Sequence, residues 1–213
     1  MAEDFRPDEV LDFWFPENGH WTCADRHRDF WMWRMQGGAD QQICARFAAL
    51  TQAAACGALD HWAETPRGRL ALLIVLDQFP RSLWRDTPGA YAQDIKATRL
   101  ALEGIDNGHF GALEHGWERQ FYIIAIGHCE GPDHLTRMEM LKDLVRVSVA
   151  GLPPVLSGFA DTALAQTDRV HGIIARFGRH PHRNAILGRV STPEEEAYIA
   201  SGDFPHVAAL KPG

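Results

Sequence analysis

The apolar residues of this chain recur at three- and four-residue intervals along most of its length, which is the pattern of amphipathic helices. They mark one buried stripe between Asp133 and Leu152 and a second between Phe159 and Phe177. Alternation of apolar and polar residues, as in a half-buried strand, nowhere extends convincingly beyond four or five positions. The pattern therefore predicts an all-α fold in which strands are not needed.

Expected helix starts are marked by three threonine–proline pairs, Thr65-Pro66, Thr87-Pro88 and Thr192-Pro193. The residue before a proline is held extended, as a helix N-cap must be, and a proline at the first helical position gives up only an N–H that has no partner. Thr192 also begins a capping box, because the side chain of Glu195 can reach back to its amide.

The remaining helices are predicted from periodicity and from stop signals such as Gly57. Their expected ranges are Pro7–Phe15, Asp25–Arg34, Ala39–Cys56, Leu59–Glu64, Arg67–Leu76, Gly89–Asp106 and His115–Cys129. In total we expect about nine or ten helices joined by short loops, in a single domain over residues 1–213. No clean 34-residue repeat is present, although the rhythm of paired helices is typical of an α-solenoid.

Composition and charge argue against a nucleic-acid-binding protein, a disulfide-bonded protein and a membrane-spanning protein. The 213 residues are 46% apolar and carry a formal charge of −7, which argues against a nucleic-acid partner, because such proteins need basic residues to displace phosphate counterions. The four cysteines form no C-x-x-C pair, so reduced thiols are expected. No apolar run approaches the roughly 20 residues of a membrane span. We expect a soluble, cytoplasmic protein with no membrane partner, and no particular oligomeric state is favoured.

The segment from Arg176 to Arg189 is unusual because it holds four arginines, two histidines and no acidic residue. One interpretation is that this segment lines a cleft and binds a carboxylate or phosphate, since a guanidinium can hold two oxygens at once. The residues that would do so are Arg179, His180, His182, Arg183 and Asn184. The other is that these arginines pair with acids of neighbouring helices. The sequence leaves both open.

His180-Pro181-His182 also resembles a metal-binding H-x-H pair. A zinc ion would need a further ligand, for which His171, His128 or Glu130 are candidates. The flanking arginines raise the local positive potential and disfavour a bare cation. We therefore expect no metal and no cofactor.

His128, Cys129 and Glu130 follow an apolar helical stripe and precede a Gly-Pro stop. His128 is either a core histidine satisfied by a backbone carbonyl or half of an acid–base pair in which Glu130 orients the imidazole. Cys129 is either a packed side chain or a nucleophile with a lowered pKa.

The run from Leu70 to Leu76 is apolar on all sides, so this helix is expected to be central and enclosed. Asp77 and Arg81 follow where Pro80 is expected to end the helix. A buried charge requires a partner, and the basic segment is the expected source of one for Asp77.

Four segments together resemble a bacterial family of unknown function, DUF924, over essentially the whole chain. They are V-L-D-F-W-F from Val10, D-Q-F-P-R from Asp77, H-C-E from His128 and H-G-I-I-A-R-F-G-R-H-P-H-R-N-A-I-L-G-R from His171. The resemblance implies a tetratricopeptide-like α-α superhelix and no established activity. The sequence departs from the family pattern at Ser82, Cys129 and His180, where asparagine, serine and an aromatic residue are common.

Our preferred hypothesis is that these segments fold around one concave pocket for a small anionic ligand. Catalytic roles, with hydrolysis as the reaction, would fall to His128, Glu130 and His171, and ligand binding to Asp77, Arg81, Arg179, His182, Arg183 and Asn184. An interaction module that clamps a peptide carboxylate is the competing class. A closed polar network that only fixes helix order is the third.

Overall fold

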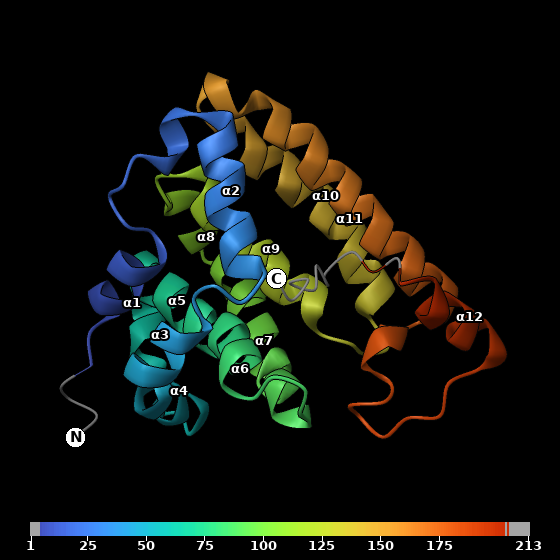
Figure 1. The fold of residues 1–213 in the computed structure, drawn as a ribbon. Coiled ribbons are helices and arrows are strands. Elements are labelled where there is room, and N and C mark those ends of the chain that lie inside the picture. Colours follow the sequence, from blue (N-terminus) through green and yellow to red (C-terminus); the bar gives the residue numbers. More distant parts are fainter. Residues whose placement is uncertain (1–4, 203, 205–213) are drawn as a thin grey trace.

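The computed structural model describes residues 5–202 and 204, and this part of the chain contains helices and no strand (Figure 1). The all-α prediction is confirmed. The α-helices are α1 (Pro7–Trp14), α2 (Ala24–Met35), α3 (Asp40–Arg46), α4 (Ala48–Ala55), α5 (Pro66–Leu73), α6 (Phe79–Leu83), α7 (Asp94–Asp106), α8 (His109–Ala112), α9 (Gly116–His128), α10 (His134–Ala150), α11 (Ser157–Phe177) and α12 (Pro193–Ser201). The tetratricopeptide-like superhelix and the single domain over 1–213 stay predictions, and residues 1–4, 203 and 205–213 lie outside the described part.

Short helical turns connect these helices and complete the architecture. They are η1 (His20–Thr22), η2 (Asp60–Glu64), η3 (Ile74–Gln78), η4 (Pro88–Tyr91), η5 (Pro154–Leu156) and η6 (Pro181–Arg183). All are 3₁₀ turns except η3, which is a π-helical turn. Within the described residues, none of the helices has the length and apolar character that crossing a bilayer requires.

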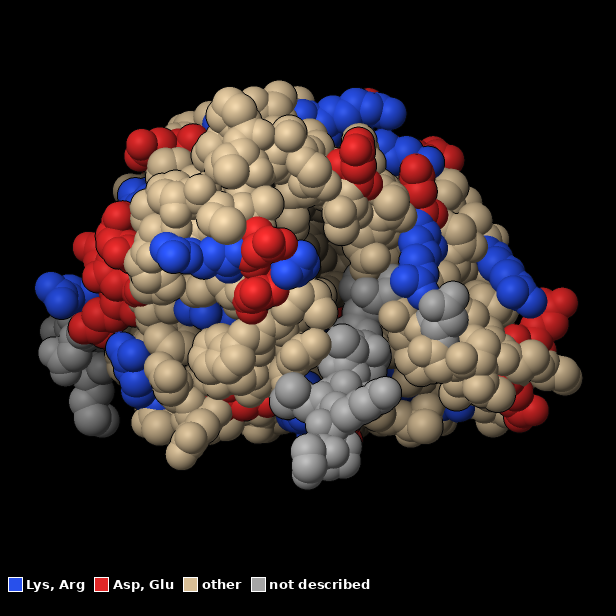
Figure 2. Space-filling view, turned by 45° about the horizontal axis from the view of Figure 1, so that its top comes forward, with Lys and Arg blue, Asp and Glu red and all other residues tan. Residues whose placement is uncertain are grey.

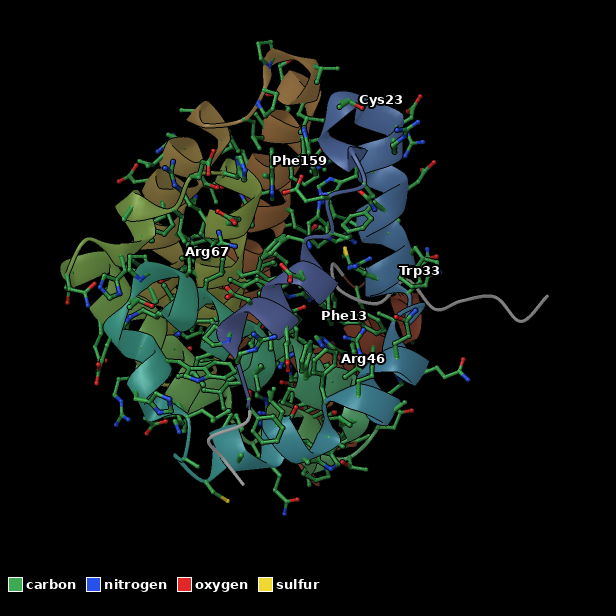
Figure 3. All side chains as sticks on the ribbon, turned by 90° about the vertical axis from the view of Figure 1, so that its left-hand side faces the viewer. Phe13, Cys23, Trp33, Arg46, Arg67 and Phe159 are labelled. Carbon is green, nitrogen blue, oxygen red and sulfur yellow. The ribbon has the colours of Figure 1, made fainter. Side chains whose placement is uncertain are left out.

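Four helices lie side by side in the order α7, α9, α10, α11, with each packed on the next (Figure 1). Because successive members run in opposite directions, the start of α7, the end of α9, the start of α10 and the end of α11 lie at one end of this layer. At the other end, η5 joins α10 to α11 and contacts η1 and α2. Figure 3 shows Phe159 of α11 beside α2. The layer therefore has two ends, each built from several chain segments.

The central helix is longer than the sequence predicts. It runs without interruption through α5, η3 and α6, so Pro80 does not end it. In η3 the amide of Phe79 bonds to the carbonyl of Ile74, five residues back, and this wider turn takes the helix past the proline. Residues Leu70–Leu76 are fully buried, as expected for an enclosed helix. The extra turn places Asp77 and Arg81 within the helix rather than after it.

Two further differences concern helix ends. The helix expected over Ala39–Cys56 divides at Phe47, whose ring packs 4.9 Å from those of Phe13 and Phe79. Thr65 and Thr192 cap their helices as predicted, whereas Thr87-Pro88 begins only the short turn η4. The Thr87 hydroxyl instead donates to the carbonyl of Trp84 at 2.7 Å.

Candidate functional site

A buried hydrogen-bonded pair of side chains joins the central helix to the end of α9. Asp77, which is 1% exposed, lies on the π-helical turn η3, and its carboxylate oxygens are 2.9 and 3.1 Å from Nδ1 of His128. Gln78 also donates to this carboxylate, at 2.5 Å. The carboxylate that orients the His128 imidazole is therefore that of Asp77, not that of Glu130. π-helical turns occur frequently at functional sites, which makes this turn a natural place for a reactive group.

Two arginines and a second carboxylate extend this pair into a network. Arg81 lies 3.3 Å from Asp77 and donates to Asp94, at the start of α7, at 2.9 Å. Arg183 of η6 approaches the other oxygen of Asp94 at 3.3 Å and donates to the carbonyl of His128 at 2.8 Å. The guanidinium of Arg183 also lies 4.5 Å from the centre of the Tyr91 ring. The partner of the basic segment in this network is thus Asp94, while Asp77 is neutralised by Arg81.

The charges of this network are not equally well compensated. Burial alone would raise the pKa of Asp77, but Arg81 and His128 outweigh it and hold the pKa below its ordinary value. Burial lowers the pKa of His128 in spite of Asp77, and the imidazole is neutral at neutral pH. Burial raises the pKa of Asp94, although Arg81 opposes this shift, and the charge of Asp77 adds to it. Burial also lowers the pKa of Arg183. Asp94 and Arg183 are therefore the groups whose charges are least supported by the protein.

Glu130 belongs to a neighbouring cluster. Its carboxylate binds the guanidinium of Arg189 and accepts a hydrogen bond from the His180 amide at 2.7 Å. Burial would raise the pKa of Glu130, but these contacts lower it. Burial raises the pKa of Cys129, which keeps the thiol protonated at neutral pH and disfavours a thiolate nucleophile. Glu130 is thus an ionised, well-paired group.

The other sequence-predicted residues lie around this centre or away from it. Arg179 pairs with Glu195 of α12 at 2.6 and 2.8 Å, and Asn184 donates to Ser191 at 3.0 Å. Burial, with Arg183 nearby, lowers the pKa of His182 to about 4. His171 is half-buried within α11, and no hydrogen bond or ion pair joins it to the network among the described residues. The structure thus brings Asp77, Arg81, His128 and Arg183 together directly, with Glu130 and His182 close by.

A small groove lies against this network, with a volume of about 230 Å³. Its polar lining comes from Asp94, Cys129, Glu130 and Arg183. Its other lining residues are Pro88, Tyr91, Ala92, Ile95 and Leu187. The groove therefore combines a mainly apolar wall with a charged floor. No group of three or more metal-ligating side chains is placed to hold a metal ion within the described residues.

Comparison with known proteins places the chain in a family without an established function. The family model described as "Bacterial protein of unknown function (DUF924)" matches residues 10–203. The chain belongs to the DUF924 family. A solved structure, "Structure of Protein of Unknown Function ATU0120 from Agrobacterium tumefaciens", is similar with 31% identity and a TM-score of 0.70, covering 92% of this chain and 97% of that one. No curated protein matches.

In this DUF924 protein, sequence reasoning missed Asp94 and Tyr91 as partners of the predicted residues. It named Arg189 only as the end of the basic segment and Glu195 only as part of a helix cap. Asp94 had a detectable signal: it precedes Ala97 and Ala101 at helical spacing, so an acidic residue falls on an otherwise buried stripe. Tyr91 had no such signal in the sequence, because the position of its ring over Arg183 depends on how the turns η4 and η6 pack together.

The charged side chains of one face of this DUF924 protein are mixed in sign. On the face drawn in Figure 2, basic and acidic side chains are interspersed. The arginines of the unusual segment are largely used within the fold, since Arg179, Arg183 and Arg189 each pair with a carboxylate. The acid-pairing interpretation of this segment therefore describes most of its arginines.

Proposed function

We propose that this protein binds a small carboxylate-bearing molecule in the groove beside Arg183. The observation that carries the proposal is the state of this arginine. Only 3% exposed, Arg183 uses Nη1 for both of its hydrogen bonds, while its buried Nε has no partner among the described residues. A buried charged donor without an acceptor is costly, and a carboxylate can supply two acceptors to one guanidinium.

The charge balance of the network supports an anion rather than a cation. Protonation of Asp94, whose pKa is raised, leaves Arg81 and Arg183 with only Asp77 to balance them. A carboxylate that binds together with a proton on Asp94 therefore leaves the net charge of the network unchanged, in a buried site where water compensates charge poorly. The small volume and apolar wall favour a short alkyl or aryl carboxylate over an extended peptide.

A reaction at this site would use the Asp77–His128 pair. With the Nδ1 hydrogen held by Asp77, the lone pair of the neutral imidazole is on Nε2, which is the arrangement of a general base. Hydrolysis, with His128 activating a water molecule, needs the fewest additional groups. Glu130 then contributes charge near the groove rather than orienting the imidazole.

Binding is tested by calorimetric titration with acetate and with butyrate. Butyrate is expected to bind about tenfold more tightly, because each buried CH₂ contributes about 0.8 kcal/mol. Arg183→Lys retains the positive charge but cannot donate to both carboxylate oxygens as a planar guanidinium does. It is expected to weaken butyrate binding by about tenfold. Arg176→Lys, an exposed position on α11, is the matched control and should bind as the wild type does.

The helical circular dichroism of each variant is measured in parallel. If folded Arg183→Lys binds butyrate as well as the wild type, or if the wild type shows no heat of binding, the proposal is wrong and the network is structural. Turnover is tested separately with mono(4-nitrophenyl) succinate, an ester that carries a free carboxylate, for which His128→Gln should lower the rate by about 10²-fold or more. Equal rates in both proteins would remove His128 from any reaction.

A further inference from the structure

A second polar recess lies at the opposite end of the helix layer from Arg183, beside η1 and the first half of α2. It has a volume of about 520 Å³ and is lined by Asn18, His20, Arg26, Asp29 and Phe30. The ring of His20 lies 5.8 Å from that of Trp117 at the start of α9. None of these residues takes part in the network around Asp77.

A chain of hydrogen bonds fixes the proton positions of two buried histidines here. Trp31 Nε1, which can only donate, lies 3.1 Å from Nε2 of His27, so this nitrogen must accept. Neutral His27 therefore carries its hydrogen on Nδ1, which lies 2.9 Å from Nδ1 of His20. His20 in turn accepts at Nδ1 and carries its own hydrogen on Nε2.

The neutral state that this assignment requires follows from burial. Both histidines are 1% exposed. Burial, with His27, Arg34 and His115 nearby, lowers the pKa of His20 to about 4, and burial lowers the pKa of His27 to about 4. This series of hydrogen bonds thus ends at Nε2 of His20, a buried N–H donor that has no partner among the described residues.

The other groups of the recess also leave donors in excess. Asp29 is already paired, because Arg28 donates to it at 3.0 and 3.1 Å. Arg26 forms no ion pair with a described residue, so its charge is not compensated within the recess. Asn18 uses Oδ1 to accept from the His20 amide at 3.1 Å, which leaves its side-chain NH₂ as a donor.

We propose that this recess is a second binding site, for a small tetrahedral oxyanion of the phosphate class. Its oxygens accept from the guanidinium of Arg26, the amide of Asn18 and Nε2 of His20. Phosphate suits this set because it offers acceptors in several directions to donors on different elements. The site is independent of the carboxylate groove beside Arg183.

The test is a titration of the full-length, ¹⁵N-labelled protein with inorganic phosphate at constant ionic strength and near-neutral pH, followed by the imidazole resonances of His20. We expect a spectrum with the hydrogen on Nε2 of His20 and a saturable shift of this signal. Arg26→Gln, at an exposed position, should weaken binding by about three- to tenfold, as for loss of one charged contact. Asp29→Asn should tighten it.

Two controls separate this site from the rest of the molecule. Arg99→Gln removes an exposed arginine of α7 and should leave the phosphate affinity unchanged, and Arg183→Lys should do the same. The inference is overturned if the His20 signal does not shift saturably, or if Arg26→Gln binds phosphate like the wild type. It is also overturned if Arg183→Lys abolishes the response, because phosphate would then occupy the other groove.

Discussion

At the scale of single residues, the buried charges of the network depend on one another. Asp77 is almost completely enclosed and has both Arg81 and His128 as partners. Removing one member of such a group leaves the others buried without compensation, which costs more than the pair itself contributes. Replacement of a single member is therefore expected to lower the stability of the folded protein.

Asp77→Asn is expected to lower the free energy of unfolding by about 3–5 kcal/mol, because Arg81 and Arg183 would then share Asp94 as their one carboxylate in this buried network. Urea unfolding followed by circular dichroism measures this change. Asp143→Asn is the control, since its side chain is 83% exposed and should have little effect. A loss of stability as small as that of the control would show that Asp77 is not a buried ionic group.

Asp94 gives the binding of carboxylates a pH dependence. Its raised pKa means that it takes up a proton as the pH falls from neutrality, and this removes a negative charge beside the bound anion. Butyrate should therefore bind more tightly as the pH is lowered from neutrality, through the range in which butyrate itself stays ionised. In Asp94→Asn this dependence should largely vanish. Calorimetric titration with butyrate at a series of pH values measures this dependence. Weaker binding at lower pH within this range would contradict the role given to Asp94.

At the scale of elements, much could be predicted from the sequence because helix periodicity and capping are local properties. α10 and α11 lie close to the ranges predicted from their stripes, and the capping box at Thr192 is present. The π-helical turn could not be predicted, since it depends on how the whole central helix is enclosed. Consequently the sequence placed Asp77 after a helix end and assigned it the wrong partner.

Two of the threonine–proline pairs allow a threonine that caps a helix to be compared with one that does not. Thr65 accepts a hydrogen bond from the Gly68 amide at 3.1 Å, whereas Thr87 makes no such cap. Thr65→Ala is expected to lower the free energy of unfolding by about 1 kcal/mol. Thr87→Ala should cost less, because its exposed hydroxyl contacts only a turn carbonyl. Urea unfolding of both variants tests this, and the reverse order would contradict it.

At the scale of the whole molecule, the antiparallel order of α7, α9, α10 and α11 gathers side chains that are distant in the sequence. Asp94 begins α7, His128 ends α9, and Arg183 follows α11, so the three meet at one end of the layer. Resemblance to a family could indicate that the polar segments belong together. It could not distinguish Arg183, at the groove, from Arg179, which holds α12.

Buried histidines distributed over the fold make the whole protein sensitive to acid. Burial lowers the pKa values of His20, His27, His134 and His182 to about 4, below the ordinary 6.5. Between these values the unfolded chain binds more protons than the native one, so stability is lost as the pH falls. Asp94, with its raised pKa, opposes this trend, but it is a single group.

The free energy of unfolding should therefore decrease by several kcal/mol between about pH 6.5 and about pH 4, since one pKa unit corresponds to about 1.4 kcal/mol. Urea unfolding at a series of pH values measures it. A stability that is constant or rises across this range would show that these histidines are not buried in their neutral form.

A crystal structure of the protein grown with saturating butyrate would show directly whether Arg183 binds a carboxylate. We expect a carboxylate within hydrogen-bond distance of the Arg183 guanidinium, with the alkyl chain against Tyr91 and Leu187. A groove without butyrate, and an Arg183 whose contacts remain only those to Asp94 and to the carbonyl of His128, would contradict it.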